Sequence, residues 1–472
     1  MRYVLLFLTI PALQSTFGQA LYPYGNEFPL GLYALYNSYD VVSADHWNCG
    51  HTYQEAPTSD DYFATCAANG LQAMARLSYL DSIGEKWSRS ESVIAQEIMQ
   101  QATQANLAWW DLPEELRYWY SNEFEIVQDY TAWTRQYDPL RRPTYMYIPG
   151  HYDVGGVEPY VPYLDILPAS CYPQWQEWPH AYVRWSVERT QQAVAEQGYT
   201  LGDNYLADEK TVMAILELFE GDLSLTAAGT WHDFWLALAC EAKGVLVFSH
   251  FYRNSSPSLS RSWDTLNAAT TIFNRENLGQ VLLQGQSVPV QVDLIEGAQL
   301  TPSFTVDTEA IQYEAVKVLA QQWQDTTYVI AVNSAEATTT FSLTGLPALT
   351  NAYTDVFSST SYTFNGTNLT AELPALGVGV YKFYPGVTST TNSFATQKYR
   401  LSSNPFTEEL TILNAAPGLT LQLFTSDGKA LSAAGLFDQY TLRGNQLARG
   451  VYLLRIYDPV TGAVETHKVI KR

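Results

Sequence analysis

The sequence predicts an α/β protein, with a (β/α)₈ barrel followed by an antiparallel β-sandwich and a small all-β domain. From Asn26 to about Gln286, short apolar or β-branched runs alternate with longer amphipathic stretches, as expected of βαβ units around a parallel sheet. From Pro289 to Pro385 the chain changes to short alternating runs rich in Thr, Ser, Val and Tyr, with turn residues between them. That texture is typical of an antiparallel sandwich.

Eight runs in the first region have the length and composition of barrel strands. They are Phe28–Leu35, Leu71–Leu77, Leu107–Trp110, Thr144–Ile148, Ile166–Cys171, Val212–Phe219, Val245–Phe248 and Val281–Leu283. The stretches between them predict helices at Tyr62–Ala68, Ser90–Gln104, Glu123–Tyr137, Tyr182–Glu196, Thr230–Glu241 and Trp263–Phe273. Eight strands with intervening helices in this length of chain match a closed barrel, which we place at 21–286.

The sandwich is expected at 289–385. Its strands are predicted at Ala315–Leu319, Tyr328–Val332, Thr338–Leu343, Tyr353–Phe357 and Val380–Phe383. A Thr- and Ser-rich linker at 386–393 leads into the last domain, 394–472.

The N-terminus has the pattern of a secretory signal peptide. Met1-Arg2 is followed by an apolar run, Tyr3–Leu13, and by the small-residue pattern Gly18-Gln19-Ala20, so we expect cleavage after Ala20. The run is too short for a membrane-spanning helix, and no later stretch approaches the roughly 20 apolar residues that a crossing needs. We therefore predict a secreted or surface-attached chain with no transmembrane segment.

Charge and aromatic content restrict the ligand. The net charge is −22, which argues against a nucleic-acid partner because phosphate binding needs clustered Lys and Arg. The chain holds 33 Tyr and 13 Trp, and although most of these rings must be core, some could stack on the C–H faces of sugars. A neutral or cationic small ligand is easier to accommodate.

The four cysteines leave two interpretations open. Cys49 and Cys66 could close a short disulfide loop in an exported protein or stay reduced, whereas Cys171 and Cys240 fit buried thiols. The segment from Asp45 to His51 could be read as a metal cluster, but no second ligand group appears at a recognised spacing. We predict no metal and no cofactor.

Catalytic groups of such a barrel lie after the carboxyl ends of its strands. Glycoside cleavage needs two carboxyl groups across the scissile bond, one to protonate the leaving oxygen and one as nucleophile or base. The third and sixth predicted strands lie on roughly opposite sides of the ring, so Glu114 or Glu115 could face Glu217 or Glu220. Glu217 interrupts an apolar strand, and burial of such an acid raises its pKa, as a general acid requires.

These carboxylates also have structural alternatives. Glu114 and Glu115 could occupy the first turn of a helix after Pro113, where acidic side chains favour the positive end of the helix dipole. Glu217 could be a structural acid that pairs with Arg76 or with another inward-facing base. Eight further residues of these loops are predicted to line the substrate site: Trp109, Trp110, Asp111, His151, Tyr152, Tyr172, His250 and Tyr252.

The first domain resembles the (β/α)₈ glycosidases. The resemblance is carried by Asp111-Leu112-Pro113-Glu114-Glu115, followed by Tyr137-Asp138-Pro139 and Arg142-Pro143, and the sandwich looks like the β domain that often follows such barrels. In the best-known clan an Asn-Glu pair ends the fourth strand and a Glu ends the seventh. On the predicted strand order those positions read Pro149-Gly150-His151 and Ser249-His250, which departs from that pattern.

The last domain resembles the type A C-terminal sorting domain of the type IX secretion system of Bacteroidetes. The matching segments are Asn404-Pro405-Phe406, Leu419–Phe424, Asp427-Gly428-Lys429, Ala448-Arg449-Gly450-Val451-Tyr452 and the basic end Lys468-Val469-Ile470-Lys471-Arg472. The resemblance implies the type IX machinery as a partner and a site of action outside the cell.

Three functional hypotheses follow. The first is a secreted glycoside hydrolase that acts on poly- or oligosaccharide with Glu115 and Glu217 as its carboxylate pair. The second is a non-catalytic glycan-binding surface protein on the same barrel, and the third is a lyase with His250, Tyr252 or His151 as base. Motifs of zinc proteases, serine hydrolases, P-loop enzymes and dinucleotide-binding enzymes are absent from the sequence.

Overall fold

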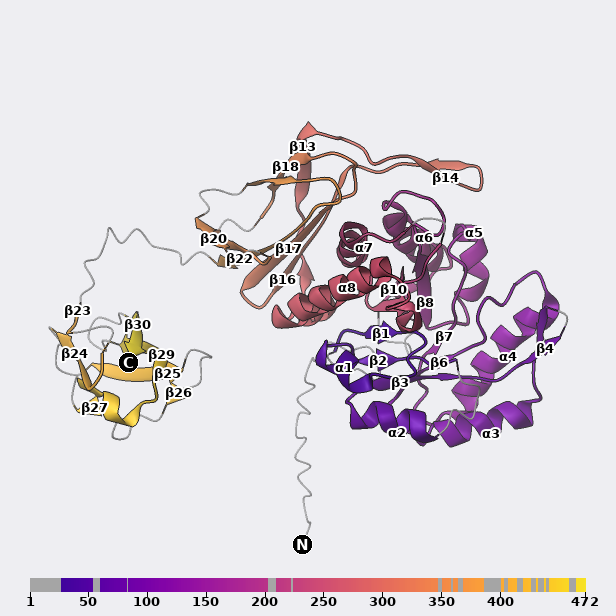
Figure 1. Cartoon of the computed structure of the whole chain (residues 1–472), viewed down its shortest axis with the longest axis horizontal. Helices are drawn as coiled ribbons and strands as arrows, with labels where there is room; N and C mark the ends of the chain where they lie inside the picture. The colour runs from indigo at the N-terminus through magenta and orange to yellow at the C-terminus, as the bar shows by residue number, and fades with distance from the viewer. Residues whose placement is uncertain are drawn as a thin grey trace, which may run out of the picture. The chain divides into compact units, whose positions relative to one another are not determined.

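The structure is a computed structural model that divides into two compact units, Met1–Val387 and Thr388–Arg472 (Figure 1). It describes residues 27–53, 60–82, 84–202, 209–221, 224–346, 350–357, 360–363, 368–385, 400–402, 406–413, 419–425, 430–431, 437–438, 441–457 and 464–472. The predicted signal peptide (1–20) and linker (386–393) lie outside the described residues.

The first unit contains a closed parallel barrel. Its strands, in order around the ring, are β1 (Leu30–Leu32), β2 (Cys49–Gly50), β3 (Gln72–Arg76), β6 (Leu107–Asp111), β7 (Thr144–Tyr145), β8 (Ile166–Cys171), β10 (Glu209–Glu217) and β11 (Val245–Phe248). The ring closes because β11 pairs with both β10 and β1. A short strand, β9 (Thr200–Leu201), pairs with the start of β10, and β4 (Leu80–Ser82) and β5 (Glu85–Trp87) form a hairpin after β3. The predicted (β/α)₈ barrel is thereby confirmed.

Two of the eight predicted strands need correction. The second barrel strand is Cys49–Gly50, which is too short to leave a recognisable apolar run. Val281–Leu283 is not a strand but part of helix α9 (Leu278–Gln284), because a short apolar run has no period that separates a strand from a buried helix. Every predicted strand from Leu71–Leu77 to Val245–Phe248 therefore moves up by one, so that β6 is the fourth barrel strand and β10 the seventh.

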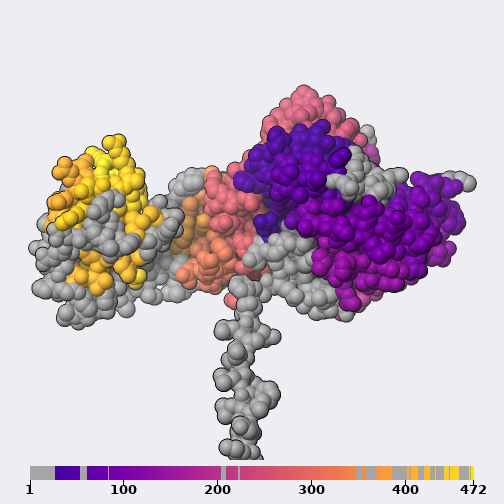
Figure 2. All heavy atoms as spheres, turned by 90° about the horizontal axis from the view of Figure 1, so that it is seen from below, coloured from indigo at the N-terminus to yellow at the C-terminus, as the bar shows by residue number. Residues whose placement is uncertain are grey.

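Helices surround the barrel. They are α1 (Tyr39–Ala44), α2 (Asp60–Ala68), α3 (Glu91–Gln101), α4 (Ser121–Tyr137), α5 (Val154–Val157), α6 (Tyr182–Glu196), α7 (Ala227–Ala239), α8 (Pro257–Arg275) and α9. Each of the six predicted helices falls on one of them. Figure 2 shows the first segments of the barrel unit, in indigo, beside the purple segments that follow them in the chain.

The alternation of side chains along the barrel strands separates two cores. On β10, Met213 and Ile215 belong to the barrel interior, as does Phe219 just beyond it, while Val212 and Ala214 pack toward the helices. Because successive side chains of a strand point to opposite faces, residue 217 has the parity of the interior set. The same rule places residues 76 and 111, two positions after Met74 and Trp109, on the interior side at the carboxyl ends of β3 and β6.

An antiparallel domain follows the barrel. Its six-stranded sheet holds β12 (Gln286–Ser287), β16 (Val316–Trp323), β17 (Thr326–Asn333), β22 (Val378–Pro385), β19 (Thr350–Asp355) and β20 (Thr360–Thr363), and its three-stranded sheet holds β13 (Gln291–Gly297), β18 (Thr339–Thr344) and β21 (Leu369–Leu373). A further hairpin joins β14 (Phe304–Val306) and β15 (Glu309–Ile311). Both sheets contribute to one core, for example Ala331 and Phe383 from the larger sheet and Phe341 from the smaller.

This domain packs on the barrel helices through β16 and β17, which lie against α7 and α9 (Figure 1). Ion pairs cross the junction from Lys317 to Glu188, at 2.7 Å, and from Lys382 to Glu276, at 2.8 Å. Apolar residues of both parts, including Ile330 and Trp235, belong to one cluster. The barrel and the antiparallel domain therefore form a single packed body.

The second unit is all-β. Its two four-stranded sheets are β23 (Arg400–Leu401), β24 (Glu409–Leu413), β28 (Thr441–Arg443) and β27 (Phe437–Asp438), and β26 (Ala430–Leu431), β25 (Thr420–Thr425), β29 (Gly450–Tyr457) and β30 (Val464–Lys471). Phe406 is buried, and its N–H donates to the Ile470 carbonyl oxygen at 2.9 Å. Asn404, Pro405 and the 427–429 segment lie outside the described residues. The sorting role of this unit stays a prediction.

All four cysteines are buried free thiols, so the disulfide suggested for Cys49 and Cys66 is absent. Cys49 lies inside the barrel, whereas Cys66 packs in the layer between barrel and helices. Within the described parts of the chain, no helix combines the length and hydropathy that a membrane crossing requires.

We predict that the native protein, prepared without reductant, shows no fast-reacting thiol, because burial raises the pKa of Cys66 and of Cys240 to about 12. After denaturation under non-reducing conditions, a thiol reagent should titrate all 4 cysteines. A titre of two thiols would instead reveal a disulfide.

Candidate active site at the barrel mouth

A cavity of about 400 Å³ opens at the carboxyl ends of the barrel strands. Its walls come from the loops after β2, β6, β7, β8, β10 and β11. The lining residues are Tyr53, Glu114, Glu115, Tyr147, Pro149, Gly150, His151, Tyr172, Trp175, Gln176, Tyr182, Phe219 and Phe248. The cavity thus combines mostly aromatic walls with two carboxylates, and its volume is that of a small-molecule site.

A charged cluster lies at the ends of β2, β3 and β6. The fully buried Asp111 accepts a hydrogen bond from His51 Nε2 at 2.9 Å. Its other oxygen, Oδ1, has no hydrogen-bond partner among the described residues. Arg76 lies 5.1 Å from the centre of the Tyr53 ring, and the charges of Asp111 and Glu114 raise its pKa although burial opposes the shift. The Arg76 charge therefore interacts with Asp111 and Glu114, and the predicted alternative of an Arg76–Glu217 pair is wrong.

Glu114 and Glu115 belong to a turn, because α4 does not begin until Ser121. The helix-dipole alternative for them is therefore wrong. The Tyr53 hydroxyl donates to Glu114 Oε1 at 2.8 Å, and burial together with the neighbouring Asp111 charge raises the Glu114 pKa. Glu115 is exposed at the rim with a positive φ of 55°, and its N–H donates to the Tyr147 carbonyl oxygen. The turn directs one acid into the cluster and the other to the rim.

Glu217 is the buried carboxyl group at the end of the seventh barrel strand. Its two oxygens accept hydrogen bonds from the backbone N–H groups of Gln174, at 2.8 Å, and Trp175, at 3.1 Å. Burial raises its pKa to about 8, in spite of these donors. Burial therefore favours the protonated form of Glu217 at neutral pH. The carboxyl group does not itself line the cavity, but it is bound to the backbone of Gln174 and Trp175, and Trp175 does line it. Glu220, three residues later, is exposed and does not line the cavity.

The predicted aromatic residues divide between core and surface. Trp109 fills the barrel interior, and Trp110 lies between barrel and helices, where its Nε1 donates to Asp138 Oδ2 at 2.9 Å. Neither ring lines the cavity. The alternation along β6 sends Trp109 into the barrel interior and Trp110 into the layer between barrel and helices, and both rings are fully buried there. Tyr172 does line it.

The remaining predicted contacts lie at or beyond the rim. His151 lines the cavity and an adjoining hollow, while Tyr152 lines only the hollow. His250 is buried against Trp263, with ring centroids 5.4 Å apart, and Tyr252 is exposed outside both cavities. The structure gives neither His250 nor Tyr252 a place in the cavity wall, which removes the geometric support for the lyase hypothesis at those two residues.

The adjoining hollow has a volume of about 350 Å³ and continues the cavity. Glu115, Pro149 and His151 belong to both. Its far side is made by Trp119 and Tyr152, whose ring centroids are 5.8 Å apart. The two spaces therefore form one longer depression along the loops after β6, β7 and β8.

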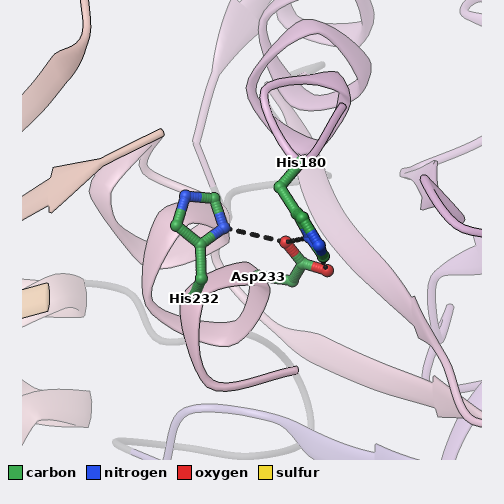
Figure 3. Close-up of side chains that lie close together, drawn as sticks. All are labelled: His180, His232 and Asp233. Carbon is green, nitrogen blue, oxygen red and sulfur yellow. Dashed lines mark hydrogen bonds and ion pairs between the residues drawn. The ribbon is translucent and has the colours of Figure 1, made fainter. Parts of the chain in front are cut away.

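Two histidines and an aspartate near Glu217 form a hydrogen-bonded group, which Figure 3 shows. His180, just before α6, donates through Nδ1 to both carboxylate oxygens of Asp233, at 2.8 and 3.0 Å. His232 Nδ1 lies 2.9 Å from the same carboxylate, and its Nε2 lies 2.9 Å from the Ser334 hydroxyl of the antiparallel domain. Gly229 leaves room for the His180 ring, since a Cβ there would lie 2.3 Å from the imidazole Cε1.

The same three side chains could hold a metal ion, because one ligand atom from each lies within 4.8 Å of the others. Their present contacts are those of an ion pair with a neutral histidine. The Asp233 charge raises the pKa of His180 although burial opposes it, burial lowers the pKa of His232, and His180 lowers the pKa of Asp233 against the effect of burial. A charged His180, a charged Asp233 and a neutral His232 satisfy every contact described above.

Several site residues were not predicted to belong to the active site. His51 entered the sequence analysis only as a possible metal ligand and Tyr53 not at all, because both follow the two-residue strand β2, which the sequence did not reveal. Gln174 and Trp175 belong to the loop after β8, just beyond the Cys171-Tyr172-Pro173 segment. The sequence could have indicated these residues only through their location within a few positions of the carboxyl end of a barrel strand.

No protein-family model and no curated protein matches the chain. Among solved structures, a GH27 β-L-arabinopyranosidase from Geobacillus stearothermophilus is similar at 10% identity and a TM-score of 0.47, over 77% of this chain and 98% of that one. An α-amylase from Anoxybacillus is similar at 7% identity and a TM-score of 0.48, over 76% and 98% of the two chains. A GH30 endoxylanase from Clostridium papyrosolvens C71 is similar at 10% identity and a TM-score of 0.45, over 76% and 96%.

We predict that Glu217 makes the protein less stable as pH rises. The pKa of Glu217 is about 8 in the folded state and about 4.3 in an unfolded chain, so the native state binds the extra proton between these values. The free energy of unfolding must then fall with increasing pH across this window. Chemical denaturation of the wild type and of Glu217→Gln from pH 5 to pH 8 should show a steeper loss for the wild type. Parallel curves would contradict the raised pKa.

We also predict that Asp233→Ala lowers the free energy of unfolding by about 2 to 3 kcal/mol, because it removes the carboxylate that binds both His180 and His232. Ser334→Ala removes only one hydrogen bond to His232 and should cost about 1 kcal/mol. Urea denaturation of both variants measures the difference. Equal losses would show that the charge pair contributes nothing beyond ordinary hydrogen bonding.

Proposed function

We propose that the protein is a glycoside hydrolase whose reaction takes place in the cavity at the barrel mouth. The observation that carries this proposal is a pair of carboxyl groups at the barrel mouth. The half-buried Glu114 follows the fourth strand and lines the aromatic cavity, whereas the buried Glu217 ends the seventh strand and is bound by the backbone of Trp175, whose side chain lines the cavity. Glycoside hydrolysis needs one carboxyl group to protonate the leaving oxygen and another as nucleophile or as base for water.

The corrected strand order supports the resemblance to the barrel glycosidases. In the clan discussed above, an Asn-Glu pair ends the fourth strand and a Glu ends the seventh. Here the fourth strand, β6, is followed by Pro113-Glu114, and the seventh, β10, ends in Glu217. A glutamate thus follows the fourth strand, three residues beyond its end, and another ends the seventh, while Pro113 precedes Glu114 where that clan has Asn.

Protonation favours Glu217 as the acid. With a pKa of about 8 it carries a proton at neutral pH, which a general acid must do before it can protonate a leaving group. Glu114 is the preferred partner because it lines the cavity and lies in the charged cluster. Burial and Asp111 raise its pKa, while Arg76 and the Tyr53 hydroxyl partly oppose that shift. Glu115, the partner predicted first, lies at the exposed rim and is better placed to contact substrate hydroxyls.

We also propose that the protein acts outside the cell. This rests on the signal-peptide pattern at 1–20 and on the segments near the C-terminus that resemble a type IX sorting domain. The all-β fold of the second unit is compatible with such a domain.

We predict that the purified full-length protein releases reducing sugar from at least one member of a panel of neutral poly- and oligosaccharides. Glu114→Gln and Glu217→Gln should each lower the rate about 10²- to 10⁴-fold, the usual contribution of an acid or base. Glu220→Gln is the matched control, since this carboxylate lies three residues from Glu217 but is exposed to solvent, whereas Glu217 is buried. Each variant must first show the circular dichroism spectrum of the wild type.

Two results would contradict the assignment. Release that survives both Glu114→Gln and Glu217→Gln would move the chemistry to different residues. The absence of release from every substrate would argue against a hydrolase.

A further inference from the structure

Two tryptophans on the loops of the barrel mouth are unusually exposed. Trp119, after β6, has 55% of its surface exposed, and Trp175, after β8, has 53%. Single exposed apolar residues are normal on a protein surface, but large rings that flank a cavity mark a binding surface more often than chance. Trp175 lines the cavity and Trp119 lines the adjoining hollow, so the two rings belong to different parts of the depression.

Both rings are braced from behind while one side stays open. Trp175 packs against Phe219, with ring centroids 5.4 Å apart, and a Cβ on Gly221 would lie 2.8 Å from its ring. Trp119 packs against Tyr152 in the same way at 5.8 Å. Such bracing limits the motion of each ring, so little conformational entropy is lost when a ligand stacks on it.

The charges of the depression favour an uncharged ligand. The hollow next to Trp119 is lined by two basic residues, Lys86 and Arg117, and by two acidic ones, Glu115 and Glu123. Arg117 and Glu123 form an ion pair, so part of this charge is already neutralised. The cavity itself adds one further acid, Glu114, to the shared Glu115, and no Lys or Arg is among its lining residues. A polyanion would be repelled there, and the net charge of −22 adds to that repulsion.

We propose that the depression from Trp175 to Trp119 is an extended binding cleft for a neutral glycan chain, with sugar rings stacked on both tryptophans and bonds cleaved between them. This inference rests on the proposed function and deepens it, because it assigns a polymeric substrate and internal attack. Aromatic faces stack on the apolar faces of sugar rings, and the carboxylates and His151 between them offer hydrogen-bond partners to hydroxyl groups. A single terminal sugar would need only the inner cavity.

Native affinity electrophoresis of the full chain tests the cleft. The gels contain soluble starch, arabinoxylan, galactomannan or mixed-linkage β-glucan, and the wild type is run beside Glu217→Gln so that hydrolysis can be recognised. At least one polymer should retard the protein. Trp119→Ala and Trp175→Ala should each weaken that retardation on the order of tenfold, since each removes a stacked aromatic contact.

Leu140→Ala is the control variant. Leu140 is as exposed as the two tryptophans, at 54%, but precedes β7 and therefore lies at the opposite end of the barrel. The polymer should retard Leu140→Ala as strongly as the wild type. The monosaccharides that make up the polymer should not abolish the retardation of the wild type.

The outcomes separate this inference from the proposed function. Release of sugar from short oligosaccharides without retention by any polymer would overturn the cleft and leave the hydrolase standing. Retention that depends on Trp119 and Trp175, without release from any substrate, would support the cleft and overturn the hydrolase. Retention that ignores both tryptophan substitutions, or that monosaccharides abolish, would also overturn the cleft.

Discussion

The closure of the barrel, through the parallel pairing of β11 with both β10 and β1, is the constraint on which the remaining structure depends. Closure gives every strand an inside and an outside, and the two-residue period then decides where each side chain points. Arg76, Asp111 and Glu217 share the parity of the interior core, so they reach the mouth from within the ring. A shift of one residue in any of these strands would turn its polar side chain toward the apolar helix layer.

The carboxyl groups at the mouth have different hydrogen-bond partners and different neighbouring charges. Asp111 has the His51 imidazole as a partner, and Glu114 has the Tyr53 hydroxyl and the nearby Arg76 cation. Glu217 accepts hydrogen bonds from two backbone N–H groups, and burial still raises its pKa. Unequal environments for two carboxyl groups at one site are what separate an acid from a base or nucleophile.

The aromatic residues serve two purposes that composition alone does not separate. Rings such as Trp109 and Tyr145 fill the barrel interior, where they exclude water from beneath the charged cluster. Rings on the loops, such as Trp175, are braced on one side and open on the other. Loops carry the second kind because their side chains are not required by the core, so they can differ without disturbing the barrel.

The sequence by itself determined the architecture, since hydrophobic period and run length reveal strands such as Ile166–Cys171 and helices such as Tyr182–Glu196 wherever an element is long. It also pointed to Glu217 as a buried acid, because an apolar strand that packs in a core buries any carboxylate it carries. Tertiary structure decided the rest. A two-residue strand, Cys49–Gly50, is held by its neighbours in the ring and not by its own pattern, and without it the strand order was shifted by one. The partners of Glu217, the separation of Glu114 from Glu115 and the exposure of Trp119 all depend on loops that meet only when the barrel closes.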